Sequence, residues 1–214
     1  MVSYPQEGGS AVIHILCADI TGADQETCRK LWEKATPHRK ARAQSYRRQE
    51  DALRCVTADA LLRYVLGTDQ YTVTQEKGGK PKIPEKPDFH YNLSHSGRWV
   101  VLSWGDGEVG VDVEEIRPDV NLQALARRYF TGEEQAYILE KDSLDRFFDL
   151  WTRKESYLKY LGTGLAKSLN SFSVLNGETG MNFWQQALPG NCRICLCSGE
   201  NEVALEITDL QKLL

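Results

Sequence analysis

The sequence lacks the features that mark a membrane-spanning or secreted protein. No apolar run approaches the ~20 residues that a helix needs to cross a bilayer. Residues 1–10 contain neither the basic nor the apolar region of a signal peptide. Six cysteines are few for a chain of 214 residues, and free thiols in the cytoplasm are the default for such a protein. We therefore expect a cytoplasmic protein that does not bind membranes.

Cysteine spacing also gives little support for a metal or redox site. Cys192 and Cys195 have CxxC spacing, but no second pair with zinc-ligand spacing follows. Cys195 and Cys197 alternate as residues of a β-strand do. We favour structural thiols here over a metal or redox function.

An excess of positive charge is absent as well. The formal net charge is −4, so general binding to nucleic acid is not expected. Basic residues are nevertheless concentrated in residues 38–48, and the loop at residues 77–84 combines lysines with glycines. This loop lacks the complete P-loop pattern and its Ser or Thr, so it is not a Walker A motif. Both segments indicate local anion sites.

The composition is that of a soluble globular protein, with 41% hydrophobic and 26% charged residues. Each half of the chain reads as a strand, then helices, then short strands. The halves meet near residues 104–108, without a linker rich in Ser, Gly or Pro. We predict an α+β protein with an N-terminal lobe of residues 1–106 and a C-terminal lobe of residues 107–214.

Helices are predicted within the basic region. Thr36 and Pro37 indicate the start of a helix. Arg39 and Arg42 share one face of it, because they are three positions apart. Arg54 belongs to a second helix over residues 51–66. Considered alone, these arginines are best explained as a solvated helix surface.

A β-hairpin is predicted from residue 99 to residue 114, because Gly105-Asp-Gly107 separates two strand-like runs. On the second strand, Gly110, Asp112 and Glu114 point to the same side. Residues two apart on a strand are roughly 6.5 Å apart, a span that one cation can bridge. A polar strand face in water explains the same pattern equally well.

A long helix is predicted from residue 144 onward, with apolar side chains on one stripe. Glu155 falls on that stripe, where a carboxylate must be neutral or have a partner. Lys159 is one turn further and can reach Glu155 or whatever Glu155 binds. An ordinary Glu–Lys surface pair is the alternative. Gly162 and Gly164 end the helix and let other backbone come close.

Three other patterns are relevant. Thr131 and Glu134 fit a capping box, which is a structural function for Glu134. His95 lies between two serines at the end of a predicted strand, a position suited to phosphate, although a loop histidine is more often solvated. Residues 171–175 have β composition and are predicted to form a strand.

We expect three carboxylates to lie close together. Asp112 and Glu114 share one side of a predicted strand, and Glu155 lies on the apolar face of a predicted helix. Hard oxygen ligands suit Mg²⁺, which usually also binds substrate phosphates. The basic segments supply anion contacts. Together these residues describe a site for a polyphosphate-bearing cofactor and its metal.

In these motifs the sequence resembles the Sfp-type 4′-phosphopantetheinyl transferases. The resemblance extends from about residue 36 to residue 175. It is carried by residues 79–84 (GKPKIP), 89–99 (FHYNLSHSGRW), 110–114 (GVDVE), 151–159 (WTRKESYLK) and 162–165 (GTGL). The order and spacing of this set are specific to the family, whereas GVDVE alone is a weak signal.

The resemblance implies a pseudo-twofold α+β fold of two similar lobes, each with helices packed on a small, mostly antiparallel sheet. It implies a Mg²⁺-dependent holo-[acyl-carrier-protein] synthase that binds coenzyme A between the lobes. Such an enzyme transfers the 4′-phosphopantetheine arm to a serine of an apo acyl or peptidyl carrier protein and releases adenosine 3′,5′-bisphosphate. It activates carrier domains of polyketide, nonribosomal peptide or fatty acid synthesis, and a monomer is expected.

The resemblance also implies functions for individual residues. Asp112, Glu114 and Glu155 match the family's Mg²⁺ ligands, and Glu155 is the candidate catalytic base. Lys159 and His95 match catalytic residues that contact the coenzyme's phosphates. The other matches are to coenzyme-binding positions: Arg39, Arg42, Arg54, Gly79, Lys80, Pro81 and Ser94.

Two other functions fit parts of the pattern. One is a different Mg²⁺-dependent phosphoryl-transfer enzyme acting on a nucleotide, and the missing Walker motif argues against it. The other is a non-catalytic module that binds carrier proteins. The complete set of Asp112, Glu114, Glu155 and Lys159 argues against this second alternative.

Overall fold

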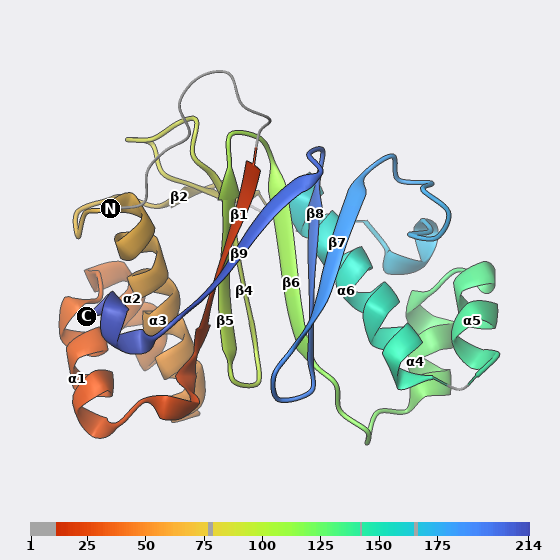
Figure 1. The fold of residues 1–214 in the computed structure, drawn as a ribbon, viewed down its shortest axis with the longest axis horizontal. Coiled ribbons are helices and arrows are strands. Elements are labelled where there is room, and N and C mark those ends of the chain that lie inside the picture. Colours follow the sequence, from red (N-terminus) through yellow and green to blue (C-terminus); the bar gives the residue numbers. More distant parts are fainter. Residues whose placement is uncertain (1–11, 77–78, 142, 165–166) are drawn as a thin grey trace.

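The computed structural model describes residues 12–76, 79–141, 143–164 and 167–214 (Figure 1). Residues 77–78 of the basic loop and Leu165 of the glycine-rich motif lie outside these ranges. Two sheets occupy the middle of the molecule, and helices cover its two opposite ends (Figure 1). The predicted α+β class is confirmed.

The first sheet has the strand order β4-β5-β1-β9. Its strands are β1 (Val12–Asp19), β4 (His90–Ser96), β5 (Trp99–Gly105) and β9 (Glu202–Thr208). The helices at this end are α1 (Gln25–Lys34), α2 (Pro37–Gln44) and α3 (Gln49–Leu66). A short ribbon of β2 (Thr74–Gln75) and β3 (Pro81–Lys82) flanks the basic loop. Buried residues of α3, such as Leu61 and Leu62, pack with Leu16 and Leu102 of the sheet in one core.

Helix α2 begins as predicted, with Thr36 at the N-cap and Pro37 at the first turn. The Thr36 hydroxyl does not cap the helix but donates to Asp59 Oδ1 at 2.8 Å. Asp59 is fully buried in α3, and it also accepts from the Tyr71 hydroxyl and the Arg63 guanidinium. The start of α2 is thereby tied to α3.

The second sheet has the order β6-β8-β7, and both strand pairs are antiparallel. Its strands are β6 (Val109–Glu115), β7 (Asn182–Leu188) and β8 (Cys192–Ser198). The helices at this end are α4 (Leu122–Tyr129), α5 (Gly132–Leu139) and α6 (Leu144–Leu161). Short 3-10 turns are η1 (Ile20–Gly22), η3 (Leu169–Ser171) and η4 (Leu210–Leu213).

Helix α6 has the boundaries that its sequence predicts. The Ser143 side chain caps its N-terminus by accepting from Arg146 N. Gly162 ends it in the left-handed region, at φ 66°. The capping box at the start of α5 is also confirmed, with Thr131 and Glu134 bonded reciprocally.

The predicted hairpin between residues 99 and 114 is wrong. β5 pairs with β4 on one side and with β1 on the other, so neither edge of β5 is free for β6. β6 instead pairs with β8. The true hairpin joins β4 to β5 through Gly97 and Arg98, with Gly97 at φ 52°.

The predicted strand at residues 171–175 is also wrong. The segment is a 3-10 turn that ends at Ser171, followed by irregular chain. Its backbone groups are bonded by buried side chains rather than by a neighbouring strand. Lys154 Nζ donates to the carbonyl of Phe172, and Glu134 Oε1 accepts from Val174 N.

A row of side chains, and not a backbone ladder, joins the two sheets. Asn92 Oδ1, Ser94 Oγ and Ser96 Oγ on β4 accept from the backbone N–H groups of Val111, Val113 and Glu115 on β6, at 3.0, 3.2 and 3.1 Å. We call this row the β4–β6 seam. Behind it, the valines of β6 pack in one core with Ile15 and Val101 of the first sheet.

The last strand of the chain returns to the first sheet. β9 lies parallel to β1, and Leu210 and Leu213 of η4 join the core beneath α1–α3. The division into lobes at residues 106 and 107 stays a prediction, and in space β9 and η4 belong with the first lobe.

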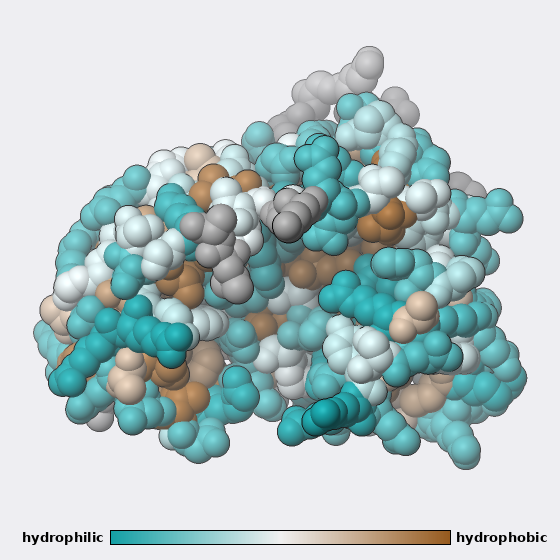
Figure 2. Space-filling view, turned by 180° about the vertical axis from the view of Figure 1, so that it is seen from behind, coloured by the Kyte–Doolittle hydropathy of each residue, from teal (hydrophilic) through white to brown (hydrophobic). Residues whose placement is uncertain are grey.

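The surface seen from behind is mostly hydrophilic, with hydrophobic residues in separate patches (Figure 2). None of the helices in the described ranges is long and apolar enough to span a membrane. All six cysteines are free thiols, and Cys195 and Cys197 are buried in β8.

Candidate active site

Gly110 determines how α6 lies on β6. A Cβ atom at this position would be 2.0 Å from the Ser156 carbonyl oxygen and 2.4 Å from Tyr160 N. The α6 backbone therefore fills the space beside Gly110, and only glycine permits that approach. Because α6 is this close, Glu155 and Lys159 lie over the polar row of β6.

Asp112 is the buried centre of the site. Its Oδ1 accepts from Lys159 Nζ at 2.7 Å and from Ser94 Oγ at 3.0 Å. Its Oδ2 is buried and has no hydrogen-bond partner. An unsatisfied buried carboxylate oxygen is costly, and each such atom needs an explanation. A ligand that binds this oxygen is the simplest one.

Glu114 and Glu155 are both half-buried beside Asp112. Burial, and then the charge of Asp112, raises the pKa of Glu114 to about 7. The same two causes, in the same order, raise the pKa of Glu155, while Lys159 opposes the shift. Asp112 therefore lies within electrostatic reach of both glutamates, and its repulsion with each of them favours the binding of a cation.

The donor chemistry of this group fits Mg²⁺. It supplies carboxylate oxygens from β6 and α6, and one buried oxygen is unpartnered. In the residues that the structure describes, no group of three or more His, Cys, Asp or Glu side chains is arranged so that it could hold a metal ion. Lys159 provides the positive charge that contacts Asp112 in this structure.

Cations converge on the other side of Lys159. The pKa of His95 is lowered by desolvation and then by Arg54, Lys159 and Arg42, while Asp51 opposes the shift. Arg54 is held in place by Asp51 Oδ1 at 2.8 Å and by the Gly97 carbonyl. Arg54, Lys159 and Arg42 therefore form a region of positive potential around a His95 side chain that stays neutral near pH 7.

A cavity of about 350 Å³ lies between the basic loop and α6. It is lined by residues of the loop, of β4 and of the C-terminal half of α6 with the turn that follows: Gln75, Gly79, Lys80, Pro81, Asn92, Glu155, Leu158, Lys159, Gly162 and Gly164. The coenzyme-binding positions predicted on the loop thus share a cavity with the two charged residues predicted on α6.

Lys80 spans the two halves of the cavity wall. Its ammonium group contacts Glu108 and donates to the Val109 carbonyl at 2.7 Å. Gly162 accommodates the Lys80 side chain, because a Cβ there would be 2.9 Å from Lys80 Cγ. Burial lowers the pKa of Lys80, and Glu108 opposes that shift.

Arg39 lies in a different environment from Arg42. It lines a second cavity, of about 820 Å³, together with Tyr71. Its Nε atom is buried and has no hydrogen-bond partner. The structure therefore brings Arg42, but not Arg39, into the electrostatic surroundings of His95.

Several residues of the site were not predicted from the sequence. Ser96 donates to the Glu114 carboxylate, and Glu108 pairs with Lys80. The polar alternation of Asn92, Ser94 and Ser96 is a signal for a shared strand face. It does not say what that face contacts.

Comparisons with known proteins agree with this geometry. Residues 108–205 match the family model described as the 4′-phosphopantetheinyl transferase superfamily. The chain is 35% identical over 165 residues to 4′-phosphopantetheinyl transferase Sfp of Bacillus subtilis, covering 73% of each chain. It is 35% identical over 179 residues to 4′-phosphopantetheinyl transferase psf-1 of Bacillus pumilus, covering 78% of this chain and 76% of that protein. AcpT of Escherichia coli, a further 4′-phosphopantetheinyl transferase, is 37% identical over 113 residues, 51% of this chain and 57% of its own.

The α+β fold and the cavity of acidic and basic residues fit an enzyme that transfers a phosphate-linked group. The family match and the coverage of these relatives make the assignment specific. The chain belongs to the 4′-phosphopantetheinyl transferase superfamily.

Proposed function

We propose that this protein transfers the 4′-phosphopantetheine arm of coenzyme A to a serine of an apo acyl or peptidyl carrier protein. The relatives are named for this transfer. The observation that carries the proposal is the shared cavity, which Lys80 of the loop lines together with Glu155 and Lys159 of α6. Such a cavity offers cations to a diphosphate and a carboxylate to the attacking hydroxyl.

Asp112, Glu114 and Glu155 would hold Mg²⁺. Two observations support this assignment of the metal ligands. The buried Asp112 Oδ2 has no hydrogen-bond partner, and Asp112 repels both Glu114 and Glu155. When bound, the ion would offset the charge of the coenzyme's diphosphate and polarise its phosphoryl oxygens.

Glu155 is the general base of this mechanism. A serine hydroxyl is a poor nucleophile until a base accepts its proton. Burial and the charge of Asp112 raise the pKa of Glu155 in the metal-free protein, and a bound Mg²⁺ would oppose that shift. The serine oxygen forms a bond to the phosphorus that carries pantetheine, and its proton passes to the Glu155 carboxylate. The bond from that phosphorus to the bridging oxygen breaks, and adenosine 3′,5′-bisphosphate leaves.

Basic side chains would stabilise the leaving group. Lys159, Arg54 and Arg42 would offer positive charge to the phosphates, and His95, whose pKa is lowered, would contact them as a neutral hydrogen-bond donor. Gly79, Lys80, Pro81 and Ser94 are assigned to the coenzyme by position in the motifs, and in this structure the Ser94 hydroxyl is bonded to Asp112 and Lys159. Arg39, which lines a separate cavity, and Arg42 would bind the 3′-phosphate side.

The expected cellular setting follows the same proposal. The protein would act as a cytoplasmic monomer on carrier domains of polyketide, nonribosomal peptide or fatty acid synthesis. Its own substrates are coenzyme A and the folded apo carrier.

Mass spectrometry of an apo carrier protein tests the proposal. Incubation with enzyme, coenzyme A and Mg²⁺ should add about 340 Da, the mass of the arm, to the carrier. Asp112→Ala should prevent the addition while leaving the circular dichroism spectrum unchanged. No mass increase on any of several apo carriers would refute the transfer, and a different nucleotide-dependent adduct would favour another phosphoryl-transfer reaction.

A further inference from the structure

The β4–β6 seam does more than join the sheets. At each of two successive polar positions, a serine of β4 accepts from a backbone N–H of β6 and donates to a carboxylate of β6. Ser94 accepts from Val113 N and donates to Asp112 Oδ1. Ser96 accepts from Glu115 N at 3.1 Å and donates to Glu114 Oε2 at 2.9 Å. Ser94 and Ser96, which are two residues apart on β4, therefore make the same pair of contacts.

Ser94 shows how complete this arrangement is. A hydroxyl has one donor hydrogen and two acceptor lone pairs. Ser94 Oγ donates to Asp112 and accepts from Val113 N and from Lys159 Nζ at 2.9 Å. The donor hydrogen and both lone pairs of Ser94 Oγ are thus used within the protein. A hydroxyl bonded in this way orients the side chains that it contacts.

Glu114 is hydrogen-bonded from the neighbouring sheet, because Ser96 Oγ on β4 donates to its Oε2 atom at 2.9 Å. The Ser96 hydroxyl is itself oriented by the Glu115 N–H group, from which it accepts at 3.1 Å. This pair of contacts restricts the rotamer of the Glu114 carboxylate.

From this geometry we propose that Ser96 is a positioning residue, which holds the Glu114 carboxylate in the orientation that a metal ion needs. The inference rests on the proposed function, because Glu114 is one of the proposed metal ligands. Hydrogen bonds to ligating carboxylates commonly affect metal affinity by about 10–100-fold.

The variants Ser96→Ala and Ser96→Thr separate the possible functions of Ser96. Ser96→Ala loses both the seam contact and the donor to Glu114. Ser96→Thr keeps the hydroxyl that makes both contacts. Ser171→Ala is a matched control, because Ser171 Oγ donates only to the Ser168 carbonyl at an exposed site.

The measurement is Mn²⁺ binding by electron paramagnetic resonance, with coenzyme A present and without a carrier. Ser96→Ala should raise the Mn²⁺ Kd about tenfold. Ser96→Thr and Ser171→Ala should bind Mn²⁺ as the wild type does. In transfer assays the half-saturating Mg²⁺ concentration should rise in the same order, with little change in the KM for the carrier.

Two outcomes would overturn the inference. They are wild-type Mn²⁺ affinity in Ser96→Ala, and a loss of affinity of about tenfold in Ser96→Thr, which would indicate packing rather than the hydroxyl. If Ser96→Ala does not fold, the Mn²⁺ affinity of Ser96→Thr still decides the question. A wild-type enzyme that modifies no carrier refutes the proposed function instead.

Discussion

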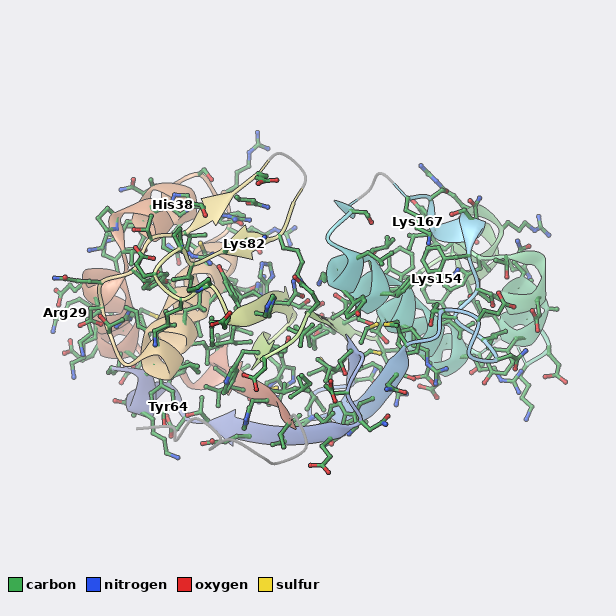
Figure 3. All side chains as sticks on the ribbon, turned by 90° about the horizontal axis from the view of Figure 1, so that it is seen from above. Arg29, His38, Tyr64, Lys82, Lys154 and Lys167 are labelled. Atoms are coloured by element: carbon green, nitrogen blue, oxygen red, sulfur yellow. The ribbon has the colours of Figure 1, made fainter. Side chains whose placement is uncertain are left out.

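The most demanding prediction concerns Lys154, a fully buried residue of the helix that carries Glu155 and Lys159. Its ammonium group lies 2.7 Å from Glu134 Oε2, and neither side chain is exposed. It also donates to the Leu169 carbonyl at 2.7 Å and to the Phe172 carbonyl. Lys154 therefore ties α6 to α5 and to the chain beyond η3 (Figure 3).

Replacing Lys154 with methionine fills the same space but leaves the Glu134 carboxylate without its counter-charge. Removing one partner of a buried pair typically costs about 3–5 kcal/mol. Glu134 keeps two backbone donors, Thr131 N and Val174 N, both at 2.9 Å. We therefore expect the lower end, about 3 kcal/mol, which corresponds to a fall in Tm of roughly 6–12 °C for a chain of this size.

Urea unfolding followed by tryptophan fluorescence measures this loss. The double variant Glu134→Gln/Lys154→Met should recover part of it, because the isolated buried charge is then removed. Lys167→Met is the matched control: Lys167 lies in the same half of the molecule (Figure 3), over the rings of Tyr157 and Phe172 at 5.1 and 4.7 Å. Its loss should cost only about 0.5–1 kcal/mol. A Lys154→Met protein within 1 kcal/mol of the wild type would refute the reasoning.

Four further predictions follow from the structure. Gly110→Ala should destabilise the protein by more than the ~1–3 kcal/mol of ordinary overpacking, because its Cβ would lie 2.0 Å from the α6 backbone; an unchanged urea midpoint would contradict that packing. Glu155→Gln should lower single-turnover transfer about 10²–10⁴-fold, and near-normal turnover would exclude Glu155 as the base. Arg42→Ala should raise the KM for coenzyme A but not for its 3′-dephospho form, whereas equal effects on both would argue against a contact with the 3′-phosphate. Among the cysteines only Cys28 is not buried, so a thiol reagent at pH 8 should modify one site in the native protein, and rapid modification of several would be inconsistent with this burial.

The same thiols predict how stability responds to alkaline pH. Burial raises the pKa of Cys17 and of Cys197 from 9.0 to about 12. The native state then holds these protons more tightly than the unfolded state does. The stability that these protonated thiols contribute is fully present below pH 9 and is lost as the pH rises toward 12. The urea midpoint should therefore fall across that range. Cys17→Ala should reduce the fall, and an identical pH profile in this variant would contradict the assignment.

Local features of this fold were predictable because they depend on neighbouring residues in the chain. The start of α2 at Pro37, the end of α6 before Gly162 and the capping box at Thr131 all follow from short-range hydrogen bonding and backbone preference. The alternation in β6 correctly separated its buried valines from the side that carries Asp112.

Strand partners were not predictable in the same way. Gly105-Asp-Gly107 is a good turn sequence, yet the strands beside it belong to different sheets. Both edges of β5 are already occupied, by β4 and by β1. That fact depends on strands far away in the sequence. The strand prediction for residues 171–175 was wrong for a related reason. This segment has the composition of a strand, but its backbone groups are hydrogen-bonded by buried Lys154 and Glu134 instead of by a neighbouring strand.

The sequence by itself determined which chemical groups are present, on which strand or helix face they lie, and which family the chain resembles. Only the tertiary structure decided that Ser96 donates to Glu114, that Lys154 is buried against Glu134, and that Arg39 and Arg42 face different surroundings. The physical reason is that periodicity reports which face of an element is buried. It cannot report what buries that face, because every strand offers the same backbone N–H and C=O groups to any partner.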